Sequence, residues 1–445
     1  MATFILSEGD DTQFGRPEAD YIEGRGGDDW IDGADGDDTI DAGPGADTAY
    51  GGPGNDQILG RGGEDYLVGG DGQDTLAGSD DRDSLFGEAG NDGVFGEAGD
   101  DFLAGMDGND IIGGGEGRDF GQGGAGADTL YGDGQDDTLA GDADGDLLDG
   151  GLGSDILYGG SGRDLLVGGD GLDTLFGDAD DDTLEAGSGN DLLHGDSGND
   201  RLNAGAGDDT AFAGAGNDQV EGGSGDDVLT GHEGDDTIAG SDGRDVLFGD
   251  AGNDRLFAGT DDDFAFGADG NDLIGGGSGR DVAHGDAGND TLYGEAQNDT
   301  LTGDSGDDVL DGGSEFDLLY GGSGRDTLAG GDGSDRLFGG RDDDTLYGGT
   351  GDDTISGDRG IDWLYGNSGR DVFVFAPESG SDIIVDFQPG IDLVDLRDYG
   401  FDSFFDFAFS ITIENVASGL HIVLPTGDHI TVNNIDRLDD DYFIL

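Results

Sequence analysis

Apolar and polar positions recur along this chain with a period of nine residues. Every ninth residue from Asp11 to Asp371 is aspartate, which makes 41 repeats without an insertion or deletion. The second residue after each Asp is Ile, Leu, Val or Phe in 35 repeats, and the second residue before it is Gly in 32. The unit is G-G-x-G-x-D-x-U-x, with U bulky and apolar, as at Gly159–Val167. A fixed period of this kind indicates stacked repeats.

The spacing within the unit predicts short strands joined by turns. One apolar residue in nine cannot form the stripe of an amphipathic helix, which needs about three per two turns. A three-residue x-U-x strand would point U inward and its neighbours outward. The other six residues are rich in Gly, which supplies the positive φ angles of tight turns. We therefore predict an all-β solenoid with an apolar row inside and Asp rows along its edges.

A longer period is superimposed on the nine-residue period. Residues 74–87 reappear in similar form at 236–249, which is 162 residues or 18 repeats later. Irregularities recur at the same offset, since Gln135 matches Gln297. An even number of repeats keeps each residue on its original face if two nonapeptides make one turn.

The composition excludes several classes of protein. The 105 acidic residues against 17 basic ones give a net charge of −88, which would repel nucleic acid and anionic membranes. The absence of Cys excludes disulfides and thiolate metal sites. No apolar run approaches the length of a transmembrane helix.

Residues 11–374 resemble the RTX (hemolysin-type) calcium-binding repeats of secreted Gram-negative proteins. The resemblance implies a parallel, right-handed β-roll with two nonapeptides per turn. It places each Ca²⁺ between the Asp of one turn and backbone carbonyls of the adjacent turn's glycine loop. It also implies an extracellular or cell-surface location.

The donor set agrees with calcium, because carboxylates and carbonyls are hard oxygen ligands. The carboxylate ligands that we expect are Asp56, Asp74, Asp119, Asp128, Asp146, Asp155, Asp164, Asp173, Asp227, Asp245, Asp281, Asp326, Asp335 and Asp353. The expected carbonyl ligands belong to Gly150, Gly151, Gly153, Gly168, Gly169, Gly171, Gly330, Gly331 and Gly333. Loops that contain Glu18, Gln135 or Glu315 depart from the motif, and we expect weak or empty sites there.

Calcium binding and folding are expected to be one equilibrium. If each site joins loops two repeats apart, the array offers at most about 39 sites, and filling them would bring the net charge to about −10. Without metal the Asp rows repel each other and the apolar core is thin, so the free energy of metal binding becomes free energy of folding. We therefore expect a disordered metal-free chain.

The two ends of the chain differ from the array. Residues 1–10 form a lead-in without the pattern of a cleavable signal peptide, and from its length we expect no N-terminal catalytic domain. Residues 375–445 are expected to form a β cap, with strands at Ile383–Val385, Ile422–Leu424 and His429–Val432. Residues 379–400 resemble the C-terminal domain of serralysin-type metalloproteases. Residues 438–445 resemble the acidic-then-apolar ending of type I secretion substrates, with an ordinary terminal strand as the alternative.

Sequence motifs for catalysis are missing. The chain has neither the H-E-x-x-H motif of zinc proteases nor the Walker Gly-Lys-Ser/Thr. His421 and His429 are expected to be ordinary strand residues. Phe or Tyr occupies the third position after Asp in 16 repeats. Such rings either shield neighbouring strands, which we favour, or bind a glycan or a neighbouring molecule.

Two classes of function remain. The first is a secreted calcium-binding structural, matrix or cell-surface protein without catalytic activity. Its expected partners are calcium ions, the type I secretion machinery and an extracellular polysaccharide or cell surface. The alternative is a non-protease enzyme or toxin of the same family, such as a polysaccharide-modifying enzyme or a cytolysin.

Overall fold

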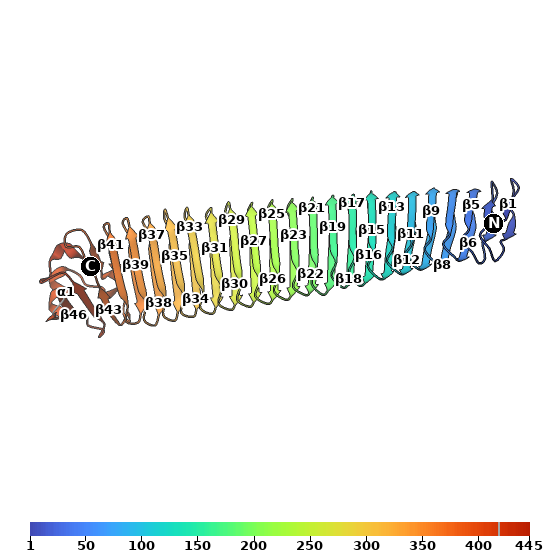
Figure 1. The fold of residues 1–445 in the computed structure, drawn as a ribbon. Coiled ribbons are helices and arrows are strands. Elements are labelled where there is room, and N and C mark those ends of the chain that lie inside the picture. Colours follow the sequence, from blue (N-terminus) through green and yellow to red (C-terminus); the bar gives the residue numbers. More distant parts are fainter. Residues whose placement is uncertain (417–418) are drawn as a thin grey trace. The chain divides into compact units, whose positions relative to one another are not determined.

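The chain folds into a parallel β-solenoid of about 22 turns followed by a short C-terminal region of strands (Figure 1). The computed structural model describes residues 1–416 and 419–445. Two compact units divide the chain, Met1–Gly223 and Ser224–Leu445. No helix in the described residues has the length and apolar character needed to cross a membrane.

In the first unit, strands of odd number form one parallel sheet and strands of even number form another. The odd strands are β1 (Thr3–Ile5), β3 (Tyr21–Glu23), β5 (Thr39–Pro44), β7 (Gln57–Gly62), β9 (Thr75–Asp80), β11 (Gly93–Ala98), β13 (Ile111–Glu116), β15 (Thr129–Gly134), β17 (Leu147–Leu152), β19 (Leu165–Asp170), β21 (Thr183–Ser188) and β23 (Arg201–Ala206). The even strands are β2 (Thr12–Phe14), β4 (Trp30–Asp32), β6 (Thr48–Pro53), β8 (Tyr66–Asp71), β10 (Ser84–Ala89), β12 (Phe102–Asp107), β14 (Phe120–Ala125), β16 (Thr138–Ala143), β18 (Ile156–Ser161), β20 (Thr174–Ala179), β22 (Leu192–Ser197) and β24 (Thr210–Ala215). β25 (Gln219–Ser224) contains residues of both units.

The second unit repeats this arrangement and then changes at its C-terminal end. Its odd strands are β27 (Thr237–Asp242), β29 (Arg255–Thr260), β31 (Leu273–Ser278), β33 (Thr291–Ala296), β35 (Val309–Ser314), β37 (Thr327–Asp332), β39 (Thr345–Thr350), β41 (Trp363–Ser368) and β43 (Ser381–Ile384). Its even strands are β26 (Val228–Glu233), β28 (Val246–Ala251), β30 (Phe264–Asp269), β32 (Val282–Ala287), β34 (Thr300–Ser305), β36 (Leu318–Ser323), β38 (Arg336–Arg341), β40 (Thr354–Arg359), β42 (Val372–Val374), β44 (Leu393–Asp395) and β48 (Phe443–Ile444). The remaining elements are η1 (Arg397–Tyr399), α1 (Phe404–Ser410), β45 (Thr412–Val416), β46 (Gly419–Val423), β47 (His429–Asn433) and η2 (Asp440–Tyr442).

The pairing confirms that one turn consists of two nonapeptides. Within each unit, array strands pair with the strand two positions later, and the paired residues lie 18 apart, as in Leu157 with Leu175. The apolar U side chains of both sheets point inward and form the core. Leu157, Leu166 and Leu175 are fully buried.

Most strands are longer than the x-U-x segments that the sequence predicts. From β5 to β41 each strand has six residues, because pairing continues past U into the glycine loop. The register skips one residue, Gly159 in β18, and then resumes at Gly160, whose φ of 105° is left-handed. A positive φ therefore bends the strand here without ending its pairing, and only three residues remain for the turn.

The C-terminal region contains the three strands that the sequence predicts, at β43, β46 and β47. β46 pairs antiparallel with both β45 and β47. β47 also pairs parallel with β43, and this pairing joins the C-terminal region to the odd-numbered sheet. Helix α1 was not predicted; Ser403 caps it by accepting a hydrogen bond from the Asp406 N–H. β48 pairs with β44 at the end of the even-numbered sheet.

Candidate metal centre

The repeat aspartates, meaning Asp11 and every ninth residue to Asp371, lie where each turn enters the next strand. The fourteen that the sequence singles out are all buried, with exposed fractions between 0% and 4%. They are Asp56, Asp74, Asp119, Asp128, Asp146, Asp155, Asp164, Asp173, Asp227, Asp245, Asp281, Asp326, Asp335 and Asp353. A buried carboxylate needs a compensating partner, so the surroundings of each oxygen decide what the row does.

The first carboxylate oxygen of each repeat Asp joins successive turns. The Asp146 N–H donates to Asp164 Oδ1 at 2.8 Å, and the Asp164 N–H donates to Asp182 Oδ1 at 2.9 Å. The Asp155 N–H donates to Asp173 Oδ1 at 2.9 Å. Within each unit, a ladder of backbone-to-carboxylate hydrogen bonds therefore joins successive turns along the sheet edge.

In most of the repeat aspartates the second oxygen is buried and has no hydrogen-bond partner. This holds for Oδ2 of Asp146, Asp155, Asp164 and Asp173, and for Asp335 and Asp353 in the second unit. Leaving a buried acceptor without a partner costs about 1–3 kcal/mol, and more when the acceptor is charged. Each of these oxygens requires either a proton or a cation.

A backbone carbonyl of the next turn lies beside the orphaned oxygen in many of these repeats. A Cβ atom placed on Gly159 would lie 2.5 Å from Asp164 Oδ2 and 2.8 Å from the carbonyl oxygen of Gly177. Both oxygens therefore face the same small space, which only Gly leaves open. Gly159 and Gly177 are also the residues that the strand register skips.

The predicted carbonyl ligands divide into two groups. The carbonyls of Gly150, Gly168 and Gly330 lie beside the Oδ2 atoms of Asp137, Asp155 and Asp317, one turn earlier. Those of Gly151, Gly153, Gly169, Gly171, Gly331 and Gly333 instead lie against the α-carbon of the corresponding glycine one turn later. The structure therefore brings the first group to the carboxylates and stacks the second group along the turns.

Electrostatics distinguishes the repeat aspartates from ordinary surface acids. Burial raises the pKa of Asp155 to about 6 and that of Asp173 to about 7, although the backbone hydrogen bond to each Oδ1 opposes the rise. The carboxylates one turn before and one turn after add to the rise at Asp173. A divalent cation would remove this penalty by neutralising the row.

The donors present fit Ca²⁺. Each space offers a carboxylate oxygen and a carbonyl oxygen, which are hard ligands, and Ca²⁺ accepts six to eight oxygens in flexible geometry. A bound cation would neutralise the unpartnered carboxylate oxygen and occupy the space that a Cβ atom would otherwise fill. The loops with Gln135 and Glu315 keep the left-handed backbone of the motif, with φ of 79° and 75°. That their sites are weak stays a prediction.

In three aspartates near the ends of the rows, Oδ2 already accepts a hydrogen bond and needs no cation. Asp11 Oδ2 accepts hydrogen bonds from the N–H and the hydroxyl of Ser7 at 2.7 Å. Asp20 Oδ2 accepts from the Arg16 N–H at 2.8 Å. Asp392 Oδ2 accepts from the N–H of Gln388, also four residues earlier, at 2.6 Å. Sequence spacing alone does not separate Asp11 and Asp20 from the open aspartates.

Two loops of the same kind lie beyond the nonapeptide array, and a strict period misses them. Asp382 and Asp392 take the positions that follow Asp362 and Asp371, because their Oδ1 atoms accept the Asp362 and Asp371 N–H groups. The intervals are 20 and 21 residues instead of 18. The triplets Asp382-Ile383-Ile384 and Asp392-Leu393-Val394 repeat the D-x-U pattern and are the signal that could have found them.

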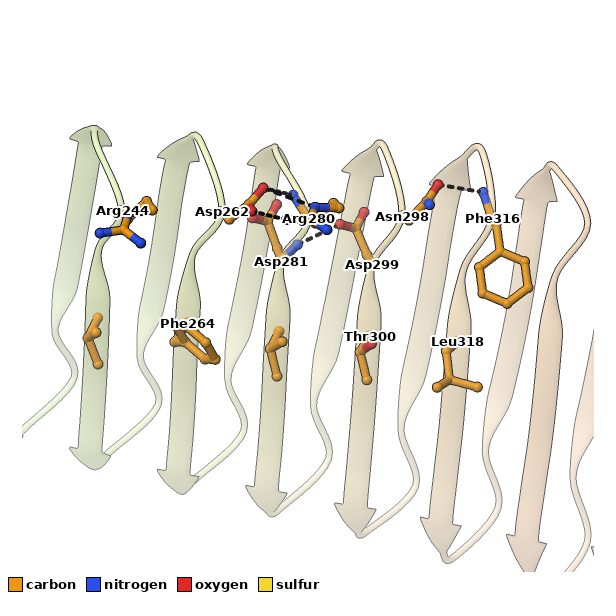
Figure 2. Close-up of a pocket in the computed structure, with 12 residues that line it drawn as sticks. Arg244, Asp262, Phe264, Arg280, Asp281, Asn298, Asp299, Thr300, Phe316 and Leu318 are labelled. Carbon is orange, nitrogen blue, oxygen red and sulfur yellow. Dashed lines mark hydrogen bonds and ion pairs between the residues drawn. The ribbon is translucent and has the colours of Figure 1, made fainter. Parts of the chain in front are cut away.

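A groove of about 720 Å³ lies on the outer face of the even-numbered sheet in the second unit (Figure 2). Phe264 and Leu318 contribute apolar surface, and Arg280 at the turns forms an ion pair with Asp262 at 2.5 Å. The two buried acids that line it, Asp281 and Asp299, belong to the repeat row. The groove is thus built from the repeat itself.

Outward-facing aromatic rings stack along the even-numbered sheet of the first unit. The rings of Tyr158 and Phe176 lie 5.0 Å apart at 6°, and those of Phe176 and His194 lie 5.0 Å apart at 9°. Nearer the N-terminus a second run has centroid separations of 5.0–6.3 Å; it comprises Phe14, Trp30, Tyr50, Tyr66, Phe86, Phe102 and Phe120. Five of the six pairs in this second run are tilted at 41–56° and one is stacked at 8°, and contacts of either kind between successive rings agree with shielding of neighbouring strands.

Two histidine arrangements lie outside the aspartate rows. His421 and His429 are strand residues, as predicted, and His421 Nε2 lies 3.0 Å from His429 Nδ1. His284 Nδ1 lies 3.4 Å from Asp304 Oδ2, with Asp286 close by. Residue spacing does not predict this group of one histidine and two aspartates, because its members come from two successive turns of one sheet.

The geometry agrees with a comparison against protein-family models. The model of the RTX calcium-binding nonapeptide repeat, in four copies, matches overlapping stretches from residue 6 to residue 376. Comparison with curated proteins gives no match. Because the family model covers most of the chain, the protein belongs to the family of RTX calcium-binding nonapeptide-repeat proteins.

Proposed function

We propose that this protein is secreted, binds Ca²⁺ along its aspartate rows and folds when it meets calcium outside the cell. The observation that supports the proposal is the orphaned, buried Oδ2 of the repeat aspartates beside a carbonyl of the next turn. Unpaired charges of this kind destabilise the metal-free fold. Binding therefore supplies free energy that folding requires.

The proposed ligands at a typical site come from two turns. Asp155 supplies its Oδ2 and Gly168 supplies its carbonyl oxygen, while the Asp155 Oδ1 keeps its hydrogen bond to the Asp137 N–H at 2.7 Å. The other aspartates named above, apart from Asp227, are proposed as ligands because their Oδ2 atoms are likewise buried without a hydrogen-bond partner, and Asp227 is proposed from its place in the repeat. The number of filled sites is proposed to stay below 39, because Asp11 and Asp20 are already satisfied.

Far-UV circular dichroism tests the coupling of calcium to folding. In excess EDTA the chain is expected to give a spectrum of disordered protein, and millimolar Ca²⁺ is expected to produce a β spectrum. Extracellular calcium modules bind at roughly 10⁻⁴–10⁻³ M, so the midpoint should fall in that range. Identical spectra in both conditions would contradict the proposal.

We also propose a structural, matrix or cell-surface role without catalysis. This is supported by the distribution of the buried acids, which follow one repeated pattern instead of converging on a single pocket. Polysaccharide or another cell-surface component is the proposed partner. Calcium-dependent pull-down from the surface material of the producing cell tests this; retention that is equal in EDTA would contradict it.

Export by a type I secretion system is proposed from residues 438–445. Their ending Asp439-Asp440-Asp441-Tyr442-Phe443-Ile444-Leu445 is acidic and then apolar. In the folded chain Phe443–Ile444 forms the short strand β48. Replacing Phe443 and Ile444 by Asp should abolish export by a reconstituted type I system, and undiminished export would contradict this role.

A further inference from the structure

Seven successive turns of the first unit each place one aromatic ring on the outer face of the even-numbered sheet. These rings are the run from Phe14 to Phe120, one on each even strand from β2 to β14, and we call them the aromatic stripe. Each ring contacts the next, with centroids 5.0–6.3 Å apart. Because no turn between β2 and β14 lacks a ring, the stripe crosses the seven strands without a break.

Contacts within the aromatic stripe leave much of it exposed to solvent. Phe14, Tyr66 and Phe120 are 60%, 41% and 37% exposed. Five of the six contacts are tilted, so most neighbouring rings do not fully cover each other's faces. Single exposed apolar residues are ordinary in soluble proteins, but a contiguous exposed patch marks an interaction site. Shielding of strands therefore explains the inner side of the stripe, and its outer side is open to a ligand.

The residues around the rings offer hydroxyl groups and almost no charge. Thr12, Thr48 and Ser84 each stand two positions before a ring on the same strand, so every second turn from β2 to β10 presents a hydroxyl beside an aromatic ring. Of the fourteen residues at the first and third positions after Asp in these seven strands, only Asp32 is charged. Charged residues make up 27% of the whole chain. This face therefore suits a ligand that is uncharged and hydroxylated.

A neutral polysaccharide matches the aromatic stripe in chemistry and in spacing. A pyranose with equatorial linkages has an apolar face of C–H groups that packs on aromatic rings, and a rim of hydroxyls that hydrogen-bond to polar side chains. Neighbouring strands lie about 4.8 Å apart, close to the length of one β-1,4-linked sugar, so one sugar can lie over each turn. An acidic polymer or a second copy of this chain would be repelled by the net charge of −88, or of about −10 with the proposed calcium sites filled.

We propose that the aromatic stripe binds a neutral β-1,4-linked polysaccharide, with the sugar chain crossing the strands and successive sugars lying over successive turns. The inference rests on the proposed cell-surface role, and it names the class of partner and the place where that partner binds. Calcium acts here through folding, because the rings come into line only when the turns stack.

Tryptophan fluorescence of the full chain in saturating Ca²⁺ tests this site. The chain has two tryptophans, and Trp363→Phe leaves Trp30, in the stripe, as the only one. The probes are hexamers of β-1,4-linked glucose, mannose and N-acetylglucosamine, and a galacturonate hexamer is the charged control. At one sugar per turn, a fully bound hexamer covers six of the seven turns and always reaches Trp30 on the second of them.

We expect at least one neutral hexamer to change the Trp30 emission saturably, and the galacturonate hexamer to leave it unchanged. The double variant Tyr66→Thr, Phe102→Thr should weaken this binding at least about tenfold, because stacking on an aromatic side chain contributes roughly that much per ring. Thr already occupies this position in β6 and β16, so the fold accepts it. The matched control is Tyr347→Ala, which removes an exposed ring from the odd-numbered sheet of the second unit and should not change the affinity.

Three results would overturn the inference: no response of Trp30 to any neutral hexamer, equal binding of the galacturonate hexamer, or an equal loss of affinity in Tyr347→Ala. A sugar-free dimer in sedimentation that the double variant dissociates would also overturn it, since a second copy would then cover the stripe. Calcium-dependent retention by surface material without binding of any hexamer would overturn this inference alone. A circular dichroism spectrum that does not respond to Ca²⁺ would overturn the proposed function instead.

Discussion

At the scale of the residue, each repeat Asp uses its two oxygens differently. Asp164 Oδ1 accepts the Asp146 N–H, and this hydrogen bond belongs to the fold whether or not metal is bound. Asp164 Oδ2 faces the Gly177 carbonyl and has no donor. One oxygen is therefore structural and the other is available to a cation.

Replacing Asp164 by Asn separates these two roles. Asn keeps an oxygen for the Asp146 N–H but removes the negative charge at the metal-facing atom. We expect the calcium concentration that half-protects peptides around residues 155–182 to rise about tenfold or more. Hydrogen exchange measures this locally. Asp170→Asn, an exposed neighbour, is the control; an equal shift in both variants would mean that net charge, not ligation, sets the affinity.

The glycine that faces the carboxylate offers a steric test. Five repeats carry buried Ala at this place, at Ala42, Ala186, Ala204, Ala213 and Ala258, so the fold tolerates one methyl group. Gly159→Ala should keep the fold at saturating Ca²⁺ but weaken the site of Asp164, because the Cβ would lie 2.5 Å from its Oδ2. We expect a lower thermal midpoint at limiting calcium.

Ala186→Gly is the reverse change and should raise that midpoint through the site of Asp191. A lower midpoint for Gly159→Ala together with a higher one for Ala186→Gly is the pair of signs expected if the space beside the glycine belongs to the metal. A plain backbone effect of Gly and Ala would give the inverse pair, a higher midpoint for Gly159→Ala and a lower one for Ala186→Gly, and would contradict this role.

At the scale of the element, the sequence predicts the solenoid because the period of nine fixes which residues are inward. Leu157 and Asp164 are buried where the repeat places them. The length of the strands was underestimated, because Gly160 reads as a turn residue although it bends a strand that goes on pairing. Helix α1 has no repeat that predicts it, and its one buried side chain, Phe407, packs against Phe401 and Phe443.

The junction between the array and the C-terminal region shows where a period stops being informative. Insertions of two and three residues shift Asp382 and Asp392 out of phase, so a strict count ends at Asp371. Pairing in space still aligns Leu364 with Ile384. Ser379 is buried between Glu378 and Gly380, whose N–H groups donate to Asp428, 50 and 48 residues away in sequence, and no local pattern encodes this contact.

The rows of buried aspartates predict an unusual pH dependence for the metal-free chain. Burial raises the pKa of Asp83 and Asp299 to about 8 from the ordinary 3.8. The folded state therefore holds protons more tightly than the unfolded chain, so its stability is fully present below about pH 4 and is lost as the pH rises through 6 to 8. In EDTA we expect more β structure at pH 5.5 than at pH 8.

Calcium should reverse this pH dependence, because it binds the ionised carboxylate and releases any proton that the carboxylate holds. The apparent affinity should increase between pH 5.5 and pH 8, and calorimetry in buffers of different ionisation enthalpy measures the protons released. Metal-free circular dichroism spectra that do not change with pH, or an affinity that falls as pH rises, would contradict the structure.

At the scale of the whole molecule, the net charge of −88 is the property that calcium changes most. A solvated polyanion and a chain of cation sites have the same composition but respond differently to divalent ions. A polyanion attracts Ca²⁺ and Mg²⁺ alike, since screening depends on valence. We predict that the sites proposed here select Ca²⁺, because Mg²⁺ requires near-ideal octahedral geometry and gives up its water reluctantly.

Anion-exchange chromatography distinguishes the two cases. With saturating Ca²⁺ the chain should elute at much lower salt than in EDTA, since filling close to 39 sites would leave a net charge of about −10. The same concentration of MgCl₂ supplies the same ionic strength and should leave elution close to that of the metal-free chain. Equal shifts in elution with both ions would mean that divalent cations screen the aspartate charges without binding at specific sites. A shift in elution that occurs only with Ca²⁺ would mean that most of the negative charge of this protein belongs to calcium ligands.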